Sequence, residues 1–181
     1  MIRRALVAAC CLALLASAAH AETLVEFPKS KAQLHLGDGW SAVSAPSLAA
    51  AYKHDAGLVL AVTRADVPNP DAWVDKKRQA YADKVEAGIK AKLPGYKRLA
   101  KKLGDASGIP ALDVEARRDG GAIVVVRVLL FRTYALSLAI EVPKGGDVAL
   151  ARSVAKAFAP PPEPPKPPAE PPKPPAPAPK R

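Results

Sequence analysis

Residues 123–131 and 134–142 read IVVVRVLLF and YALSLAIEV, and these two neighbouring segments decide the predicted fold. The second segment alternates between bulky and small or polar residues, which is the period of a β-strand. The first segment is apolar on both sides apart from Arg127, so a strand of this composition needs cover on both faces. The bulky side of the second segment consists of Tyr134, Leu136, Leu138, Ile140 and Val142. We therefore predict two adjacent strands of a sheet that is packed on both sides.

Arg127 is the charged residue in the apolar segment 123–131. A buried arginine needs a carboxylate partner, and Asp113 or Glu115 in the preceding segment 111–118 could supply it. The interpretation that we favour places Arg127 near an end of the sheet, where its guanidinium reaches water.

Outward from these segments, turn signals such as Asp55-Ala56-Gly57 separate further short strands. A helix is predicted from Asn69-Pro70 to the residue before Pro94-Gly95, and a second helix is capped by Asp147 and ended by Pro160. This order of elements predicts an α+β fold with an antiparallel sheet flanked by helices. The apolar face of the first helix is predicted to contain Trp73, Val74, Ala80, Tyr81, Val85 and Ile89. The remaining strands are predicted at 31–36, 40–44, 48–54, 58–66, 96–103 and 111–118.

This order, with particular residues in place, resembles the PsbP-like superfamily, which includes extrinsic proteins of photosystem II and small bacterial envelope proteins. The resemblance covers roughly residues 30–159 and implies an α/β/α sandwich. The matching residues are turn glycines and core aromatics, and the family shares no catalytic constellation, so the resemblance implies a non-enzymatic accessory or binding domain. It rests on Gly39-Trp40, Asn69-Pro70, Gly108-Ile109-Pro110-Ala111, Tyr134-Ala135-Leu136 and Phe158.

The N-terminus, MIRRALVAACCLALLASAAHA, has the pattern of a secretory signal peptide. Arg3 and Arg4 precede an apolar run to Ala19 that is shorter than the ~20 residues a membrane-spanning helix needs. We predict cleavage after Ala21 and a periplasmic or secreted protein without a transmembrane span. Both cysteines, Cys10 and Cys11, would leave with the signal peptide, and residues 22–159 would form one domain.

The positive charge is concentrated in residues 76–102, which carry ten basic and two acidic residues, whereas the whole chain has a formal net charge of +10. Such a stretch can bind anionic envelope components or an acidic protein. The alternative is a solvated helix decorated with lysines. Export argues against nucleic acid as the partner. The candidate binding residues are Lys76, Lys77, Arg78, Lys97, Arg98, Lys101 and Lys102.

Residues 160–181 read PPPEPPKPPAEPPKPPAPAPKR and contain thirteen prolines. Proline lacks the backbone donor and fixes φ, so we predict a disordered tail of polyproline II character. Three interpretations remain open: an inert extension, a ligand that docks into an aromatic groove, and a spacer that ends in Lys180-Arg181.

No catalytic motif is found in the sequence. His54 beside Asp55 indicates turn chemistry rather than a metal site, because a site needs three or four spaced ligands. The glycine doublets lack the spacing of a phosphate-binding loop, so we predict no cofactor. We therefore expect a non-catalytic binding or scaffolding protein of the cell envelope. The alternative is a small-ligand carrier or hydrolase with a cleft near Trp40 or Trp73.

Overall fold

The computed structural model describes residues 23–66 and 75–161. Its centre is a seven-stranded sheet in the order β3-β4-β5-β9-β8-β7-β6, in which all neighbouring strands are antiparallel. A separate antiparallel pair, β1 (Thr23–Phe27) and β2 (Ala32–Leu36), lies beside it. The seven strands are β3 (Trp40–Ala42), β4 (Ala50–His54), β5 (Val59–Asp66), β6 (Lys97–Ala106), β7 (Ile109–Arg117), β8 (Ile123–Leu130) and β9 (Tyr134–Val142).

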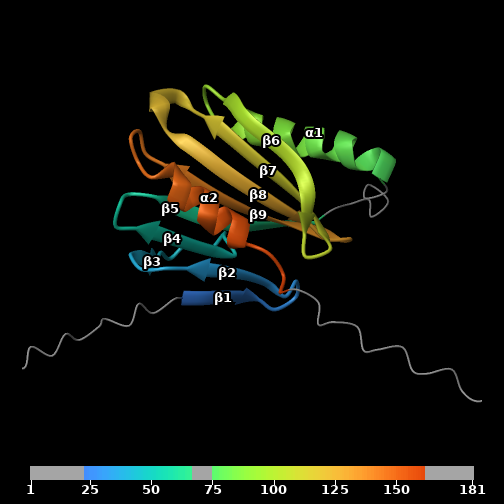
Figure 1. Cartoon of the computed structure of the whole chain (residues 1–181), viewed down its shortest axis with the longest axis horizontal. Coiled ribbons are helices and arrows are strands. Elements are labelled where there is room, and N and C mark those ends of the chain that lie inside the picture. Colours follow the sequence, from blue (N-terminus) through green and yellow to red (C-terminus); the bar gives the residue numbers. More distant parts are fainter. Residues whose placement is uncertain (1–22, 67–74, 162–181) are drawn as a thin grey trace, which may run out of the picture.

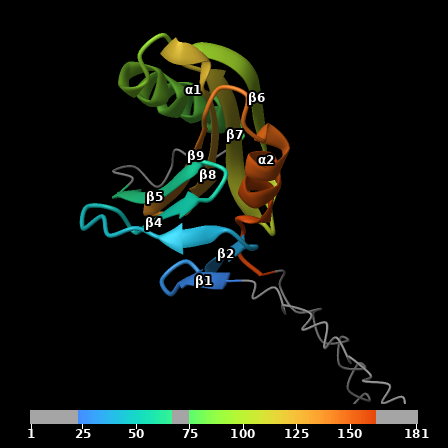
Figure 2. The same cartoon turned by 90° about the vertical axis from the view of Figure 1, so that its left-hand side faces the viewer.

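Helices cover the two faces of the sheet. Helix α1 (Asp75–Lys92) lies on one face and α2 (Val148–Ala157) on the other, as Figures 1 and 2 show. The β1–β2 pair lies on the α2 side, where β2 contacts α2. The predicted α+β class, with an antiparallel sheet flanked by helices, is therefore confirmed.

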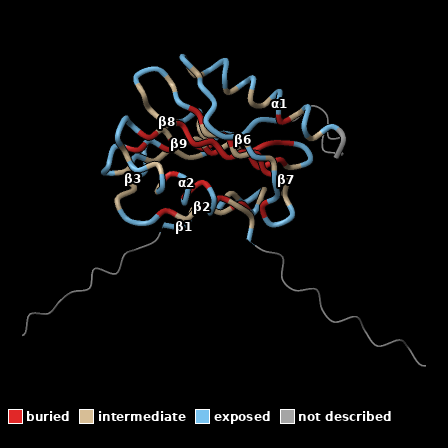
Figure 3. Tube along the Cα trace, turned by 45° about the horizontal axis from the view of Figure 1, so that its top comes forward, coloured by how far each residue is buried: buried red, intermediate tan, exposed pale blue. Residues whose placement is uncertain are grey.

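Two apolar cores hold these layers together, and the buried residues concentrate in β8 and β9 between them (Figure 3). On the α2 side, Phe158 is fully buried and its ring meets Phe27 edge-on at 5.8 Å. On the α1 side, Ala82 packs against the valines of β8. Both faces of β8 are thus buried, as its apolar sequence predicts.

The strand predictions are confirmed to within a few residues at their ends, and 134–142 matches β9 in full. Strand β1 was not predicted. Residues 104–108 lie between the predicted strands 96–103 and 111–118, and in the structure they extend β6 and β7 into a tight turn at Ser107 and Gly108, both with positive φ. The Asp105 side chain accepts the Gly108 N–H at 2.7 Å and stabilises this turn.

The placement of Ala80 on the apolar face of the first helix is wrong, because Ala80 is exposed and Ala82 is buried in its stead. Tyr81, Val85 and Ile89 do pack against the sheet. The predicted helix start at Asn69-Pro70, the signal peptide, and the tail from residue 162 onward lie outside the described residues.

The favoured position of Arg127, near a sheet end and in water, is also wrong. Arg127 lies in the middle of β8, opposite Asp113 on β7 and Leu138 on β9, and is only 9% exposed. The physical reason is the period of the strand: odd-numbered residues of β8 face α2, and the helix covers Arg127 from that side. The alternative partner Asp113 is the residue that the structure places against it.

Candidate anion-binding cleft

Strand β6 is one edge of the sheet, and it carries the second half of the predicted basic cluster. Alternation sends its basic residues to opposite faces. Lys101 lies opposite Val114, on the α1 side, whereas Lys102 lies opposite Asp113, on the α2 side. A register shift between Arg98 and Ala100 places Arg98 on the α1 side together with Lys101. The basic run therefore does not form one surface.

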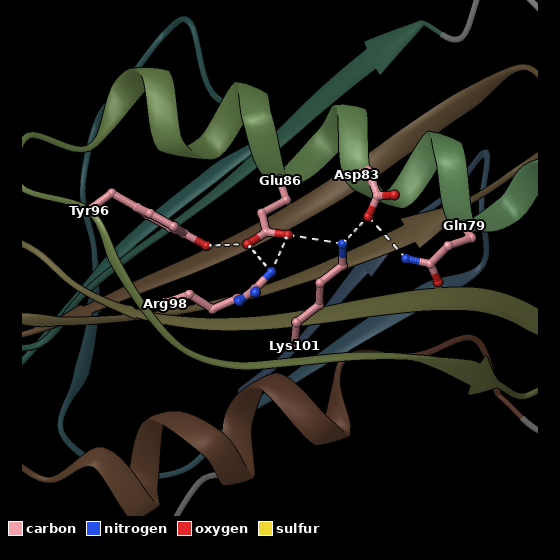
Figure 4. Close-up of polar contacts among 6 residues, drawn as sticks. All are labelled: Gln79, Asp83, Glu86, Tyr96, Arg98 and Lys101. Atoms are coloured by element: carbon pink, nitrogen blue, oxygen red, sulfur yellow. Dashed lines mark hydrogen bonds and ion pairs between the residues drawn. The ribbon is translucent and has the colours of Figure 1, made fainter.

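The two cations on the α1 side are neutralised by carboxylates of the helix (Figure 4). Lys101 pairs with Asp83 and, at 2.9 Å, with Glu86. Arg98 donates to both oxygens of Glu86 at 3.0 and 3.1 Å, and the Tyr96 hydroxyl donates to Glu86 Oε1 at 2.8 Å. These contacts join β6 to α1, and they leave little free positive charge for a partner.

This network shifts the pKa values of its members. Burial raises the pKa of Tyr96, and its hydrogen bond to Glu86 adds to that shift, to about 12. The hydrogen bond from Lys101 lowers the pKa of Asp83. For Glu86 burial acts to raise the pKa, but the hydrogen bonds from Lys101 and Tyr96 outweigh it, and the net shift is downward. The carboxylates thus stay ionised at neutral pH and Tyr96 stays neutral.

A Tyr96→Phe variant tests how much the Tyr96 hydroxyl contributes to the free energy of unfolding, because that contribution depends on pH. Because the folded pKa of about 12 lies above the ordinary tyrosine pKa of 10.0, stabilisation by Tyr96 is fully present below pH 10.0 and is lost as the pH rises toward 12. We expect the variant to be about 1 kcal/mol less stable than the wild type at pH 8, a figure discounted for partial solvation, and the gap to close near pH 12. Urea unfolding at both pH values measures this; a gap that persists at pH 12 would contradict it.

The first half of the predicted cluster lies in the first turns of α1. Lys76 belongs to its first turn, Lys77 is exposed and Arg78 is half-buried. Because α1 covers the face opposite α2, these residues are separated by the sheet from Lys97 and Lys102. The seven candidate residues therefore do not form one surface. Three belong to α1, two lie on the α1 side of β6, and two lie on its α2 side: Lys76, Lys77 and Arg78; Arg98 and Lys101; Lys97 and Lys102.

A cavity of about 370 Å³ lies on the α2 side, between α2 and strands β6, β7 and β8. We call it the α2 cleft. Lys102 is the member of the predicted cluster that lines it. The charged residues of its lining are Lys102, Asp113, Glu115, Arg127, Arg152 and Lys156.

The buried pair of Arg127 and Asp113 forms one wall of the α2 cleft. Arg127 Nε donates to Asp113 Oδ1 at 2.7 Å and Nη2 donates to Oδ2 at 3.0 Å, so the pair is bidentate. The remaining Nη1 donates to the carbonyl of Lys156 at 2.6 Å. A cation at this position also suits the negative end of the α2 dipole. Arg127 thereby fastens the last turn of the helix to the sheet.

The second carboxylate of the α2 cleft is engaged in the same manner. Arg152 donates through Nε and Nη2 to the two oxygens of Glu115, each at 2.8 Å, and this hydrogen bonding raises the pKa of Arg152. Neither Lys102 nor Lys156 forms an ion pair among residues 23–66 and 75–161. Among the described residues, the lining therefore holds two carboxylates that are bound by arginines and two lysines without an ion-pair partner.

The sequence did not predict that Arg152 and Lys156 of α2 line this cleft. Arg152 and Lys156 are four residues apart, so they lie on the same side of the helix. This spacing is the signal that the sequence offers. Only the packing of α2 against the sheet shows that both residues line the same cavity as Lys102. Asp113 and Glu115 were named as possible partners of Arg127, and the structure shows each bound to an arginine, Asp113 to Arg127 and Glu115 to Arg152.

At the alternative site near Trp40, both ring nitrogens of His54 contact backbone groups. A hollow of about 250 Å³ is lined by Ser41, Lys53, His54 and Asp55. His54 Nδ1 accepts the Ala56 N–H at 3.0 Å, and Nε2 lies 3.1 Å from the Asp38 carbonyl. Both ring nitrogens are thus held by the backbone, which confirms the predicted turn chemistry of His54. Trp73, the other residue named for this alternative, lies outside the described residues.

Within residues 23–66 and 75–161, no three His, Cys, Asp or Glu side chains gather in a way that could hold a metal ion. No helix in the same ranges is long and apolar enough to cross a membrane.

Comparison with solved structures identifies a protein of similar fold. The solution structure of cyanobacterial PsbP (CyanoP) from Synechocystis sp. PCC 6803 matches with a TM-score of 0.54, covering 77% of this chain and 92% of that chain at 13% identity. The fold is PsbP-like. A protein of unknown function from Pseudomonas aeruginosa (PA94) matches with a TM-score of 0.40 and 15% identity, covering 78% and 98% of the two chains. No protein-family model and no curated protein matches the sequence.

The residues that carried the resemblance have structural roles in the PsbP-like fold. Gly39 has φ +80, and a Cβ there would lie 2.9 Å from the His54 ring. Gly108 has φ +80 in the β6–β7 turn. Tyr134 and Phe158 are buried core residues. None of these residues lines the α2 cleft, so the fold likeness and the candidate site rest on different parts of the sequence.

Proposed function

We propose that this chain is a non-catalytic, extracytoplasmic binding protein of the cell envelope that receives acidic side chains of a partner protein in the α2 cleft. The observation that carries the proposal is the pair of lysines, Lys102 and Lys156, which form no ion pair within residues 23–66 and 75–161 and line a cleft whose two carboxylates are both bound by arginines. Four cationic and two anionic side chains give the lining a net charge of +2.

The shape of the site favours a protruding acidic group over a flat anionic surface. Lys102 lies on the edge strand and Lys156 on the last turn of α2, with the cavity between these elements. A carboxylate on a side chain can enter such a cavity, whereas a planar membrane surface cannot follow it. The apolar residues Val125 and Ala155 in the same lining suit the methylene groups of a glutamate.

Two properties of the cleft agree with binding rather than catalysis. The two acids are held in bidentate ion pairs, so the oxygens of both carboxylates are engaged by arginines. Arg127 and Arg152 are oriented by those same carboxylates, which fixes the walls before a ligand arrives. A site built in this way offers fixed positive charge at low reorganisation cost.

The test is a titration of residues 22–181 with a fluorescent hexaglutamate peptide at low salt. A Lys102→Glu/Lys156→Glu variant should raise the Kd at least tenfold, because two attractive charges become repulsive. We expect the interaction to weaken steeply between 50 and 300 mM salt, since exposed charge pairs are screened. Fluorescence anisotropy measures both effects.

The matched control is a Lys53→Glu/Lys84→Glu variant, which changes the net charge equally at two exposed lysines that do not line the α2 cleft. It should change the Kd less than threefold. An equal rise in the Kd for both variants would mean that the peptide responds to the net charge of the protein and not to the α2 cleft. Binding to anionic vesicles that depends on Lys102 and Lys156, without peptide binding, would replace the acidic protein by a lipid surface.

A further inference from the structure

Strand β6 is a long outer edge of the sheet. It spans ten residues, Lys97–Ala106, whereas β3 at the other edge spans three. Within residues 23–66 and 75–161, its backbone hydrogen bonds run to β7, and no other segment pairs with its outer side. In an antiparallel edge strand, the N–H and C=O groups of alternate residues point away from the sheet. Strand β6 therefore presents a row of backbone donors and acceptors.

The part of β6 that follows its irregularity is a regular strand. The register shift lies between Arg98 and Ala100, and from Ala100 to Ala106 every residue pairs with β7 without interruption. This part contains no proline, so each of its residues has a backbone donor. Its length is sufficient for a further strand, because strands in globular proteins usually have about 5–6 residues. We call residues 100–106 the open edge.

The α2 side of the open edge offers a positive charge between two small residues. Lys102 lies on this side, and alternation places Ala100 and Gly104 on the same side. A Cβ at Gly104 would have nothing within 4 Å, so the space beside Lys102 is open. Lys102 forms no ion pair within residues 23–66 and 75–161. In an added strand, the side chain next to Lys102 would therefore be best matched by a carboxylate, since opposite charges attract across strands.

The α1 side of the open edge has a different character. Lys101 is already paired with Asp83 and Glu86 of α1 (Figure 4), and Leu103 packs against the core beneath that helix. The Asp105 carboxylate accepts a hydrogen bond within the β6–β7 turn. This side thus offers apolar surface and a cation that is already neutralised. The complementary strand alternates acidic residues on the α2 side with apolar residues on the α1 side.

We propose that the acidic partner binds through an extended segment of alternating acidic and apolar residues, which pairs with the open edge and adds an eighth strand to the sheet. This inference rests on the proposed function, because Lys102 belongs both to the open edge and to the α2 cleft. An acid of the added strand lies beside Lys102 at the border of the cleft. Backbone hydrogen bonds to β6 supply affinity, and the alternation of side chains supplies specificity.

The test uses ¹⁵N-labelled residues 22–181 and a synthetic peptide of alternating glutamate and valine at low salt. Because strand pairing shields the outward N–H groups of β6, we expect alternate amides of residues 100–106 to exchange at least tenfold more slowly with saturating peptide. Lys102→Glu should raise the peptide Kd at least fivefold, because an attractive charge becomes repulsive. Lys53→Glu, a charge reversal at an exposed lysine of β4, should change the Kd less than twofold.

Methylation of the peptide backbone separates strand pairing from attraction between charges. Two further peptides have the same side chains, but one carries N-methyl groups on its glutamates and the other on its valines. Only one edge of an added strand faces β6, so only one of these two sets of N–H groups donates to it. We therefore expect one methylated peptide to bind at least tenfold more weakly than the parent peptide, and the other to retain its affinity.

Three results would overturn the proposal. If both methylated peptides bind as the parent peptide does and the amides of residues 100–106 stay unprotected, acids bind through side chains alone, and the proposed function stands without the added strand. If neither this peptide nor hexaglutamate binds, the proposed function fails as well. Protection of the open edge without peptide, increasing with protein concentration, would show that a second copy occupies it. Amide spectra of each variant, compared with the parent, establish that the fold is intact.

Discussion

Replacing Asp113 by alanine is expected to lower the free energy of unfolding by about 3 kcal/mol, because it leaves the charge of Arg127 buried and unpaired. Arg127 is 9% exposed, and its remaining partner is the Lys156 carbonyl. A buried charge keeps its desolvation penalty when its counter-charge is removed. The Asp113 side chain is itself 40% exposed, which places the loss at the lower end of the range for buried pairs.

Removing Arg127 together with Asp113 separates the cost of an unpaired buried charge from the contribution of the ion pair to the free energy of unfolding. In an Asp113→Ala/Arg127→Met variant, an apolar side chain of similar length replaces the guanidinium. We expect this double variant to recover all but about 1 kcal/mol of the wild-type stability, since apolar replacements of buried pairs are often neutral. Chemical denaturation of the four members of this cycle gives the coupling energy.

The pair of Glu115 and Arg152 provides the matched control. It has the same bidentate geometry, and Glu115 lies on the same strand as Asp113, but Arg152 belongs to α2 and is 60% exposed. Glu115→Ala should therefore cost no more than about 1 kcal/mol. A loss as large as that of Asp113→Ala would show that bidentate geometry, and not the burial of Arg127, sets the cost.

Replacing Phe158 by alanine is expected to cost about 4 kcal/mol, the largest single effect of a core truncation in this chain. Phe158 is fully buried, touches Phe27, and follows directly on α2. Its truncation removes apolar burial and leaves a cavity between α2 and the β1–β2 pair. The same residue holds Ala159 next to Gln33, so amide hydrogen exchange of β2 should accelerate along with the loss of stability.

Phe158→Leu is the control for this change. Leucine keeps most of the apolar volume, so this variant should lose only about 1.5 kcal/mol. Thermal or urea unfolding of both variants measures the difference. A loss below about 1 kcal/mol for Phe158→Ala would indicate that the surrounding side chains close the cavity, and that α2 is held chiefly by its polar contacts.

The sequence predicts the sheet well because its signals are local. The alternation of residues 134–142 and the two-sided apolar run 123–131 specify strand faces directly, and the structure bears them out. The same alternation of side chains could not predict how deeply Arg127 is buried. Whether a residue in mid-strand meets water depends on where α2 lies, and that position is set by contacts between distant parts of the chain.

The candidate site is less accessible to sequence reasoning for a related reason. Residues 76–102 are continuous in the sequence, but strand alternation assigns Arg98 and Lys101 to acids of α1 and turns Lys102 toward α2. Arg152 and Lys156 come to Lys102 from a helix about fifty residues later in the chain. Net charge along the sequence therefore located a basic region without showing which of its charges are free.

Strand β6 has a second consequence. It is the outer strand of the sheet, and its free backbone groups could pair with any other extended chain. Lys97 and Lys102, which lie on the α2 side, and the irregularity between Arg98 and Ala100 make such pairing unfavourable, because two copies would bring like charges together out of register. The opposite edge, β3, spans only Trp40–Ala42. We therefore expect the lysines of this edge to disfavour aggregation through strand pairing.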